Sequence, residues 1–136
     1  MILGGSGFIG GNLSRYLAKR GYTVSVFDLQ APAEKTEGIT WLTGDLFDDA
    51  SLERITADAD VIIHALSTVN PGNSNRDFLR GYAGDFVQTV KLFDLACRKN
   101  IRVIFLSSAG TVYGRYDGEP FRERHALQPI NHYGSI

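Results

Sequence analysis

The chain lacks several features that would place it in a specialised class of protein. Its single cysteine, Cys97, excludes a disulfide within the chain. It has no apolar run of about 18 residues and no signal-peptide pattern at its start, so nothing predicts a membrane span or export. The formal net charge is −1 and the basic residues are scattered, so the basic face that nucleic acid binding requires is missing.

The remaining composition is that of an ordinary globular domain. Of 136 residues, 43% are hydrophobic and 21% are charged, which suits one cytoplasmic domain spanning residues 1–136. Cys97 is in register with apolar helix positions, so we expect a buried thiol. Cys, His and acidic residues do not share the spacing of metal ligands, so we expect no metal site.

Strand-like and helix-like segments alternate along the sequence. Short apolar runs predict strands at residues 1–3, 23–27, 39–43, 60–65 and 101–106. Helical periodicity predicts helices at residues 9–20, 51–55 and 77–100, and the connection 30–38 has room for a short one. Because helix-length crossovers make neighbouring strands parallel, we expect an α/β fold, a Rossmann-type doubly wound sheet with strand order 3-2-1-4-5 and helices on both faces.

Two of the expected helices carry an apolar stripe that predicts their buried face. In the first, Ile9, Leu13 and Leu17 recur every four residues. In the long helix, the stripe consists of Tyr82, Phe86, Val90, Phe93 and Cys97. We expect both stripes to pack in the core.

A glycine motif stands between the first strand and the first helix. It reads Gly4-Gly5-Ser6-Gly7-Phe8-Ile9-Gly10, a spacing that lets a strand turn into a helix and lets backbone amides approach a pyrophosphate. A flexible turn is the alternative. Asp28 ends the next strand, where a carboxylate can accept both hydroxyls of an adenosine ribose. No arginine follows Asp28 to offset its charge against a further phosphate, so we expect NAD rather than NADP.

Other polar groups follow the remaining strands, at the edge where ligands bind in such sheets. Asp45 could bond the adenine amino group while Leu46 packs on the ring, although Asp45 could instead be a helix cap or a solvated acid. The expected cofactor-binding residues are Gly4, Gly7, Phe8, Ile9, Gly10, Asp28, Leu29, Asp45, Leu46, Ala65, Leu66, Ser67, Ser107 and Tyr133.

A second group of residues suggests catalysis. Small hydroxyl residues, Ser107 and Ser108, directly follow the fifth expected strand, and Tyr133 enters on a later helix. A serine hydroxyl and a phenol could both reach a substrate oxygen, one as hydrogen-bond donor and the other as acid or base. An unperturbed tyrosine has a pKa of about 10, so its phenolate needs a nearby cation.

The motifs together resemble those of the extended short-chain dehydrogenase/reductase family, in its nucleotide-sugar epimerase and dehydratase branch. The matching motifs are GGSGFIG at residues 4–10, GDL at 44–46, HAL at 64–66, SSAGTVYG at 107–114 and YGSI at 133–136. The resemblance implies NAD as cofactor, a nucleotide-sugar substrate and Tyr133 as catalytic base, in carbohydrate metabolism. The reaction implied is reversible hydride transfer at a sugar hydroxyl. The enzyme implied is an isomerase, a UDP-sugar 4-epimerase.

The sequence departs from the family pattern at three places. Ala109 stands where most relatives have the catalytic Ser or Thr, so Ser108 is the expected substitute. Asp85 replaces a commonly found asparagine, and an extra carboxylate near the site would disfavour phenolate. The family's YxxxK lysine would stand at position 137, just after Ile136, and relatives continue with further strands and a substrate lobe. We therefore expect an N-terminal, cofactor-binding part that is inactive alone.

Two other functions remain open on the same residues. The chain could be a non-catalytic NAD-binding module of an atypical family member, or part of an NAD(P)H-dependent carbonyl reductase. The polar segment 67–76 could be a mobile flap over substrate or a disordered connection. An exposed apolar margin of the sheet would favour a homodimer.

Overall fold

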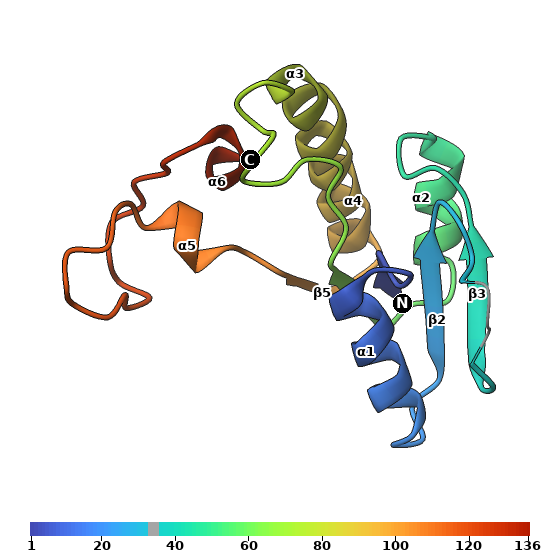
Figure 1. Cartoon of the computed structure of the whole chain (residues 1–136). Helices are drawn as coiled ribbons and strands as arrows, with labels where there is room; N and C mark the ends of the chain where they lie inside the picture. The colour runs from blue at the N-terminus through green and yellow to red at the C-terminus, as the bar shows by residue number, and fades with distance from the viewer. Residues whose placement is uncertain (33–35) are drawn as a thin grey trace. The chain divides into compact units, whose positions relative to one another are not determined.

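The computed structural model describes residues 1–32 and 36–136 and contains a five-stranded parallel sheet (Figure 1). The strands are β1 (Ile2–Leu3), β2 (Val24–Asp28), β3 (Ile39–Thr43), β4 (Val61–His64) and β5 (Arg102–Phe105). Their order, β3-β2-β1-β4-β5, confirms the Rossmann-type topology expected from the sequence. The connection 30–38, for which a short helix is expected, includes residues 33–35, which lie outside the described residues.

Contacts divide the chain into two compact units. Unit 1 consists of Met1–Leu66 and Gln88–Leu106 and contains the whole sheet. Unit 2 consists of Ser67–Val87 and Ser107–Ile136. The expectation of one domain over residues 1–136 stays a prediction. Among the described residues, no helix combines the length and apolar character that a membrane crossing requires.

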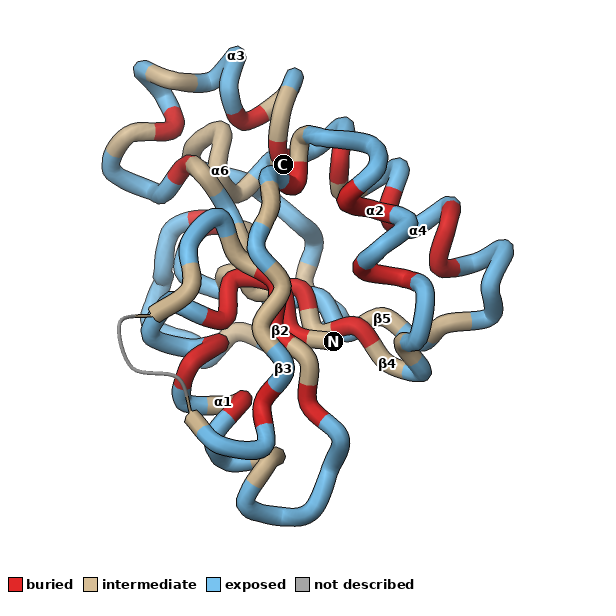
Figure 2. The backbone as a smooth tube through the Cα atoms, turned by 90° about the vertical axis from the view of Figure 1, so that its right-hand side faces the viewer, coloured by how far each residue is buried: buried red, intermediate tan, exposed pale blue. Residues whose placement is uncertain are grey.

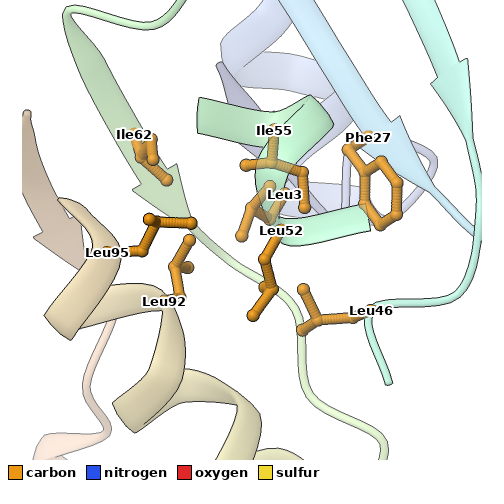
Figure 3. Packing of buried hydrophobic residues seen from close by; sticks show 8 residues of the cluster. All are labelled: Leu3, Phe27, Leu46, Leu52, Ile55, Ile62, Leu92 and Leu95. Atoms are coloured by element: carbon orange, nitrogen blue, oxygen red, sulfur yellow. The ribbon is translucent and has the colours of Figure 1, made fainter. Parts of the chain in front are cut away.

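Helices cover both faces of the sheet in unit 1. Helix α1 (Phe8–Ala18) packs on one face, and α2 (Asp49–Thr56) and α4 (Val87–Arg98) pack on the other (Figure 1). Figure 3 shows the apolar side chains that meet between the sheet and the helices α2 and α4. This cluster consists of Leu3, Phe27, Leu46, Leu52, Ile55, Ile62, Leu92 and Leu95.

Two ion pairs join α2 to α4 at the surface of unit 1. The Lys91 ammonium lies 2.8 Å from the Asp49 carboxylate, and Lys99 lies 2.7 Å from Glu53. The hydrogen bond from Lys91 holds the pKa of the Asp49 carboxyl below its usual range. Because these pairs are exposed, the apolar contacts beneath them contribute most of the stability.

The stripe expected to bury α1 is only partly correct. Leu13 and Leu17 pack against the second core cluster, but Ile9 is 56% exposed. The fully buried positions of α1 are Gly10, Gly11 and Ser14. Small side chains at these positions allow the helix backbone to approach the sheet closely, so the bulkier residues lie beside the contact.

The prediction that the apolar stripe of the long helix is its buried face is wrong, and so is the prediction that the Cys97 thiol is buried. The face of α4 in the core carries Gln88, Leu92, Leu95 and Ala96. Phe86, Val90 and Phe93 are all more than a third exposed, and Cys97 is exposed. Both stripes have helical spacing and both are apolar, so periodicity alone does not distinguish them. The stripe that is not in the core extends past the sheet margin, where the Phe93 ring meets Phe105 of β5 edge-on at 5.9 Å.

Strand β5 forms from the apolar run at residues 101–106, but it is not buried. Figure 2 shows no buried residue in β5, and Ile104 and Phe105 are 45% and 47% exposed. Among the described residues β5 pairs with β4 alone, so it is an edge strand. A homodimer through this margin stays a prediction.

Unit 2 is built from short elements. They are α3 (Phe78–Arg80), the π-helix η1 (Gly81–Phe86), α5 (Ala109–Val112) and α6 (His132–Ser135). The helix expected over 77–100 is therefore helical but not uniform, because its first part widens into a π-helix. The sequence reasoning missed α5.

We expect Leu92→Ala to lower the free energy of unfolding by about 2–5 kcal/mol, because a fully buried leucine leaves a cavity when truncated. Val90→Ala, two residues away and 48% exposed, should change it by less than about 0.5 kcal/mol. Urea unfolding of both variants measures the difference. Equal losses would mean that the buried face of α4 is assigned incorrectly.

Candidate cofactor site and catalytic residues

The glycine turn in unit 1 leaves no room for side chains at two positions. Gly4 has φ +79°, and a Cβ there would lie 2.8 Å from the carbonyl oxygen of Ala65. A Cβ on Gly10 would overlap the carbonyl oxygen of Gly4. The Gly7 amide donates to that same oxygen at 3.1 Å, which closes the turn. The backbone of the glycine turn therefore packs against the end of β4, which the absence of a side chain at Gly4 allows.

The turn leads directly into the N-terminus of α1, which is open. Gly7 is the N-cap and supplies no side-chain hydrogen bond, and the first turn carries no acidic residue. Phe8 is 87% exposed at this end. Backbone N–H groups of the first helical turn have no partner within the helix, and the helix dipole makes them favourable to an anion. The end of α1 can therefore hold a phosphate group.

Asp28 lies at the end of β2, where it is hydrogen-bonded to the glycine turn. One carboxylate oxygen accepts from the Ser6 amide at 2.8 Å and the other from the Leu29 amide at 2.7 Å. The Ser6 hydroxyl also donates to the Gln30 carbonyl at 2.6 Å. Each carboxylate oxygen has lone-pair capacity left, so Asp28 can accept two further hydroxyl groups. Sequence reasoning missed the role of Ser6.

The residues expected around adenine are exposed to different degrees. Asp45 is exposed, and its carboxylate accepts from the Phe47 amide at 2.9 Å. The helix cap considered for Asp45 belongs to Asp48, which accepts from Ala50 at the start of α2. Leu46 is only 4% exposed and belongs to the core. Its contact with an adenine ring stays a prediction. Because the side chain is buried, little of its surface is exposed for such a contact.

The end of β4 is fixed by His64. This residue is 2% exposed, and its Nε2 lies 3.0 Å from the Thr89 hydroxyl. Its Nδ1 lies 3.4 Å from the Leu66 amide, which donates to it. Ala65 and Leu66 follow directly and lie against Gly4. His64 is therefore a buried structural residue at the end of β4.

The candidate catalytic residues lie in unit 2. Ser108 is the N-cap of α5, and its carbonyl accepts from the amides of Thr111 and Val112, both at 3.0 Å. Its hydroxyl makes no cap hydrogen bond, which leaves it available to a ligand. The exposed Ser107 precedes it.

Tyr133 lies on α6, which packs against α5 within unit 2. The Ile130 amide donates to the Thr111 carbonyl at 3.1 Å, and a side chain at Gly134 would overlap that carbonyl. The Asn131 side chain caps α6 by accepting from Gly134. Ser108 and Tyr133 are thus carried by two adjacent short helices. The catalytic roles of Ser108 and Tyr133 stay predictions. The same holds for cofactor contacts of Ser67, Ser107 and Tyr133.

His132 is half-buried and makes several contacts within unit 2. Its backbone amide donates to the Asn75 side chain at 3.1 Å. Its ring lies 3.3 Å from the Tyr82 hydroxyl and near the Phe78 ring. Within residues 1–32 and 36–136, no group of three or more His, Cys, Asp or Glu side chains could hold a metal ion.

Comparison with known proteins identifies a family. The family model "NAD dependent epimerase/dehydratase family" matches residues 1–135. The UDP-glucose 4-epimerase of Rhizobium leguminosarum bv. trifolii is 30% identical over 139 residues, which cover 98% of this chain and 42% of that protein. The chain thus spans less than half the length of this relative.

Solved structures share the fold. A short-chain dehydrogenase/reductase superfamily protein from Agrobacterium tumefaciens, solved with bound NAD, is 28% identical with a TM-score of 0.83, over 98% of this chain and 40% of that one. The UDP-N-acetylglucosamine 4-epimerase from Methanobrevibacter ruminantium M1, solved with UDP-N-acetylmuramic acid, is 29% identical with a TM-score of 0.85, over 98% and 45%. NAD is the cofactor of the family. This chain belongs to the NAD-dependent epimerase/dehydratase family.

Proposed function

We propose that the chain is the NAD-binding part of an enzyme that epimerises a nucleotide-sugar, a UDP-sugar 4-epimerase. The observation that carries this proposal is the combination in unit 1 of the closed glycine turn, the uncapped start of α1 and Asp28. The names of the relatives support the reaction, and the substrates found in related structures support the UDP-sugar. The chain spans 42% and 45% of these two relatives, so the activity proposed is that of a longer protein.

The residues of unit 1 fit a dinucleotide. The open amides of α1 donate to the pyrophosphate, and the absence of side chains at Gly4 and Gly10 allows the backbone to approach it. Asp28 accepts the two hydroxyls of the adenosine ribose. Its negative charge repels the phosphate that NADP carries at this position, which favours NAD.

The chemistry of the reaction is divided between cofactor and protein. The chemistry that bound NAD would supply is reversible hydride transfer at a sugar carbon. Tyr133 takes the proton of the sugar hydroxyl, and the Ser108 hydroxyl donates a hydrogen bond to the same oxygen. The short helices α5 and α6 hold these two groups through the backbone contacts at Thr111.

We expect Asp28→Ala to weaken NAD binding by about 10-fold or more, because hydrogen bonds to a charged group contribute about 1.5–3 kcal/mol each. Titration calorimetry of the chain with NAD and with NADP measures the effect, and the preference for NAD should largely disappear.

Two further variants make the Asp28 result specific. Asp28→Asn keeps an oxygen for the Ser6 amide but removes the charge, so it should lose cofactor preference while the turn remains folded. Asp58→Ala removes an exposed acid of unit 1 that lies outside the site and should bind NAD normally. Unchanged NAD affinity in Asp28→Ala would contradict the assigned site.

We expect Tyr133→Phe to lower turnover of a UDP-sugar by about 100-fold or more in the protein that contains this chain, because acid–base groups typically contribute that much. NAD binding should remain, since the phenol acts on the substrate oxygen. Steady-state kinetics with UDP-glucose or UDP-galactose measures the change.

Tyr116→Phe is the matched control, because Tyr116 is 67% exposed and its hydroxyl donates to the Gly118 carbonyl. It should leave turnover unchanged. Normal NAD binding without measurable turnover in the wild-type protein would instead favour a non-catalytic binding module. A preference for NADPH would favour the carbonyl reductase.

A further inference from the structure

The segment that follows β4 is held by a single carboxylate. Asp85 is 6% exposed and accepts from the Thr68 amide at 2.8 Å and the Val69 amide at 3.3 Å. It also lies 2.8 Å from the hydroxyls of both Ser67 and Thr68. All these residues belong to unit 2. One side chain therefore satisfies the polar groups of three consecutive residues.

The π-helix places this carboxylate. Asp85 is in η1, where the wider turn interrupts the α-helical register, and single π-turns of this kind occur often at functional sites. A side chain at Gly81 would overlap Ile136 and lie 3.2 Å from Val69. The last residue beyond α6 therefore packs at the same place in unit 2 as the segment that Asp85 holds.

An ionised carboxylate only accepts hydrogen bonds, and this fixes the direction of each bond. The Thr68 hydroxyl must donate its proton to Asp85. The Ser67 hydroxyl has two acceptors at 2.8 Å, Asp85 and the Val69 carbonyl, so its proton is committed to one of them. What each hydroxyl can still offer is its oxygen lone pairs.

The two hydroxyls lie at the start of the held segment, which directly follows Leu66 in the sequence. Ser67 is exposed and Thr68 half-buried, so both oxygens have solvent access to a ligand.

We propose that Asp85 is a positioning residue that makes the hydroxyl oxygens of Ser67 and Thr68 acceptors for a sugar hydroxyl. This inference rests on the proposed function, which supplies two sources of such a group, the ribose of NAD and the sugar nucleotide. The pyrophosphate diester of either molecule carries only hydrogen-bond acceptors at neutral pH, so it does not match hydroxyls that have only lone pairs to offer.

The test reverses one hydrogen bond without removing the side chain. In Asp85→Asn, the amide oxygen can still accept the backbone amides, but its NH2 donates to Thr68, so the Thr68 hydroxyl becomes a donor. We expect affinity for one probe, NAD or UDP-glucose, to fall about 3- to 10-fold, which is the range of one net hydrogen bond. Calorimetry with each probe separately identifies which sugar hydroxyl is bound.

Thr68→Val should reproduce this loss, and combining it with Asp85→Asn should add little, because both changes act through one hydroxyl. Amide hydrogen exchange supplies a readout that does not depend on a ligand. Protection at Thr68 and Val69 should persist in Asp85→Asn and fall in Asp85→Ala. Asp94→Asn, an exposed acid paired with Arg98, is the control and should change neither affinity nor protection.

Unchanged affinity for both probes in Asp85→Asn would overturn the inference, as would full additivity with Thr68→Val. Unchanged protection in Asp85→Ala would show that Asp85 does not hold the segment. A wild-type chain that binds neither probe overturns the proposed function and the ligand assigned here. The exchange data still decide, independently of that failure, whether Asp85 holds the segment.

Discussion

The site depends on the close backbone approach at the glycine turn. The Gly4 position lies against the carbonyl of Ala65, and Gly10 lies against the carbonyl of Gly4, so neither position accepts a Cβ. This contact fixes the start of α1 at the edge of the sheet where β2 and β4 end. The open amides and Asp28 are then neighbours as a consequence of packing, because the Ser6 amide of the turn donates to Asp28. The capacity to bind a phosphate therefore follows from the absence of side chains at Gly4 and Gly10 and from the open amides of α1.

The sheet could be predicted from sequence because its signals are local and agree with one another. Each strand is a short apolar run, and each helix-length crossover imposes a parallel neighbour. The buried face of α4 could not be predicted in the same way. Leu92 and Phe93 both belong to apolar stripes of helical spacing, and the choice depends on where the sheet ends. That information lies in β5, which is an edge strand with exposed Phe105.

The residues of the candidate cofactor site can be recognised in the sequence more easily than the polar contacts of unit 2, and their binding of NAD stays a prediction. Asp28 and the glycines are recognisable because their spacing matches a ligand of fixed size. The partners of Asp85 lie 16 to 18 residues away along the chain, and no periodicity connects them. The π-helix that presents Asp85 and the helix α5 also have no sequence signal of their own. The segment held by Asp85 depends on side-chain hydrogen bonds that form only in the folded geometry.

Asp28 and Asp85 illustrate why two acids with similar partners can act differently. Each accepts two backbone amides, Asp28 from Ser6 and Leu29 in unit 1, and Asp85 from Thr68 and Val69 in unit 2. Asp28 is half-buried and accepts two of them, so its oxygens keep capacity for a ligand. Asp85 is buried, and its oxygens are occupied by neighbouring groups, so it can influence a ligand only through the hydroxyls that it orients. The roles proposed for the two acids therefore differ because their exposure and number of hydrogen-bond partners differ, although the residue type is the same.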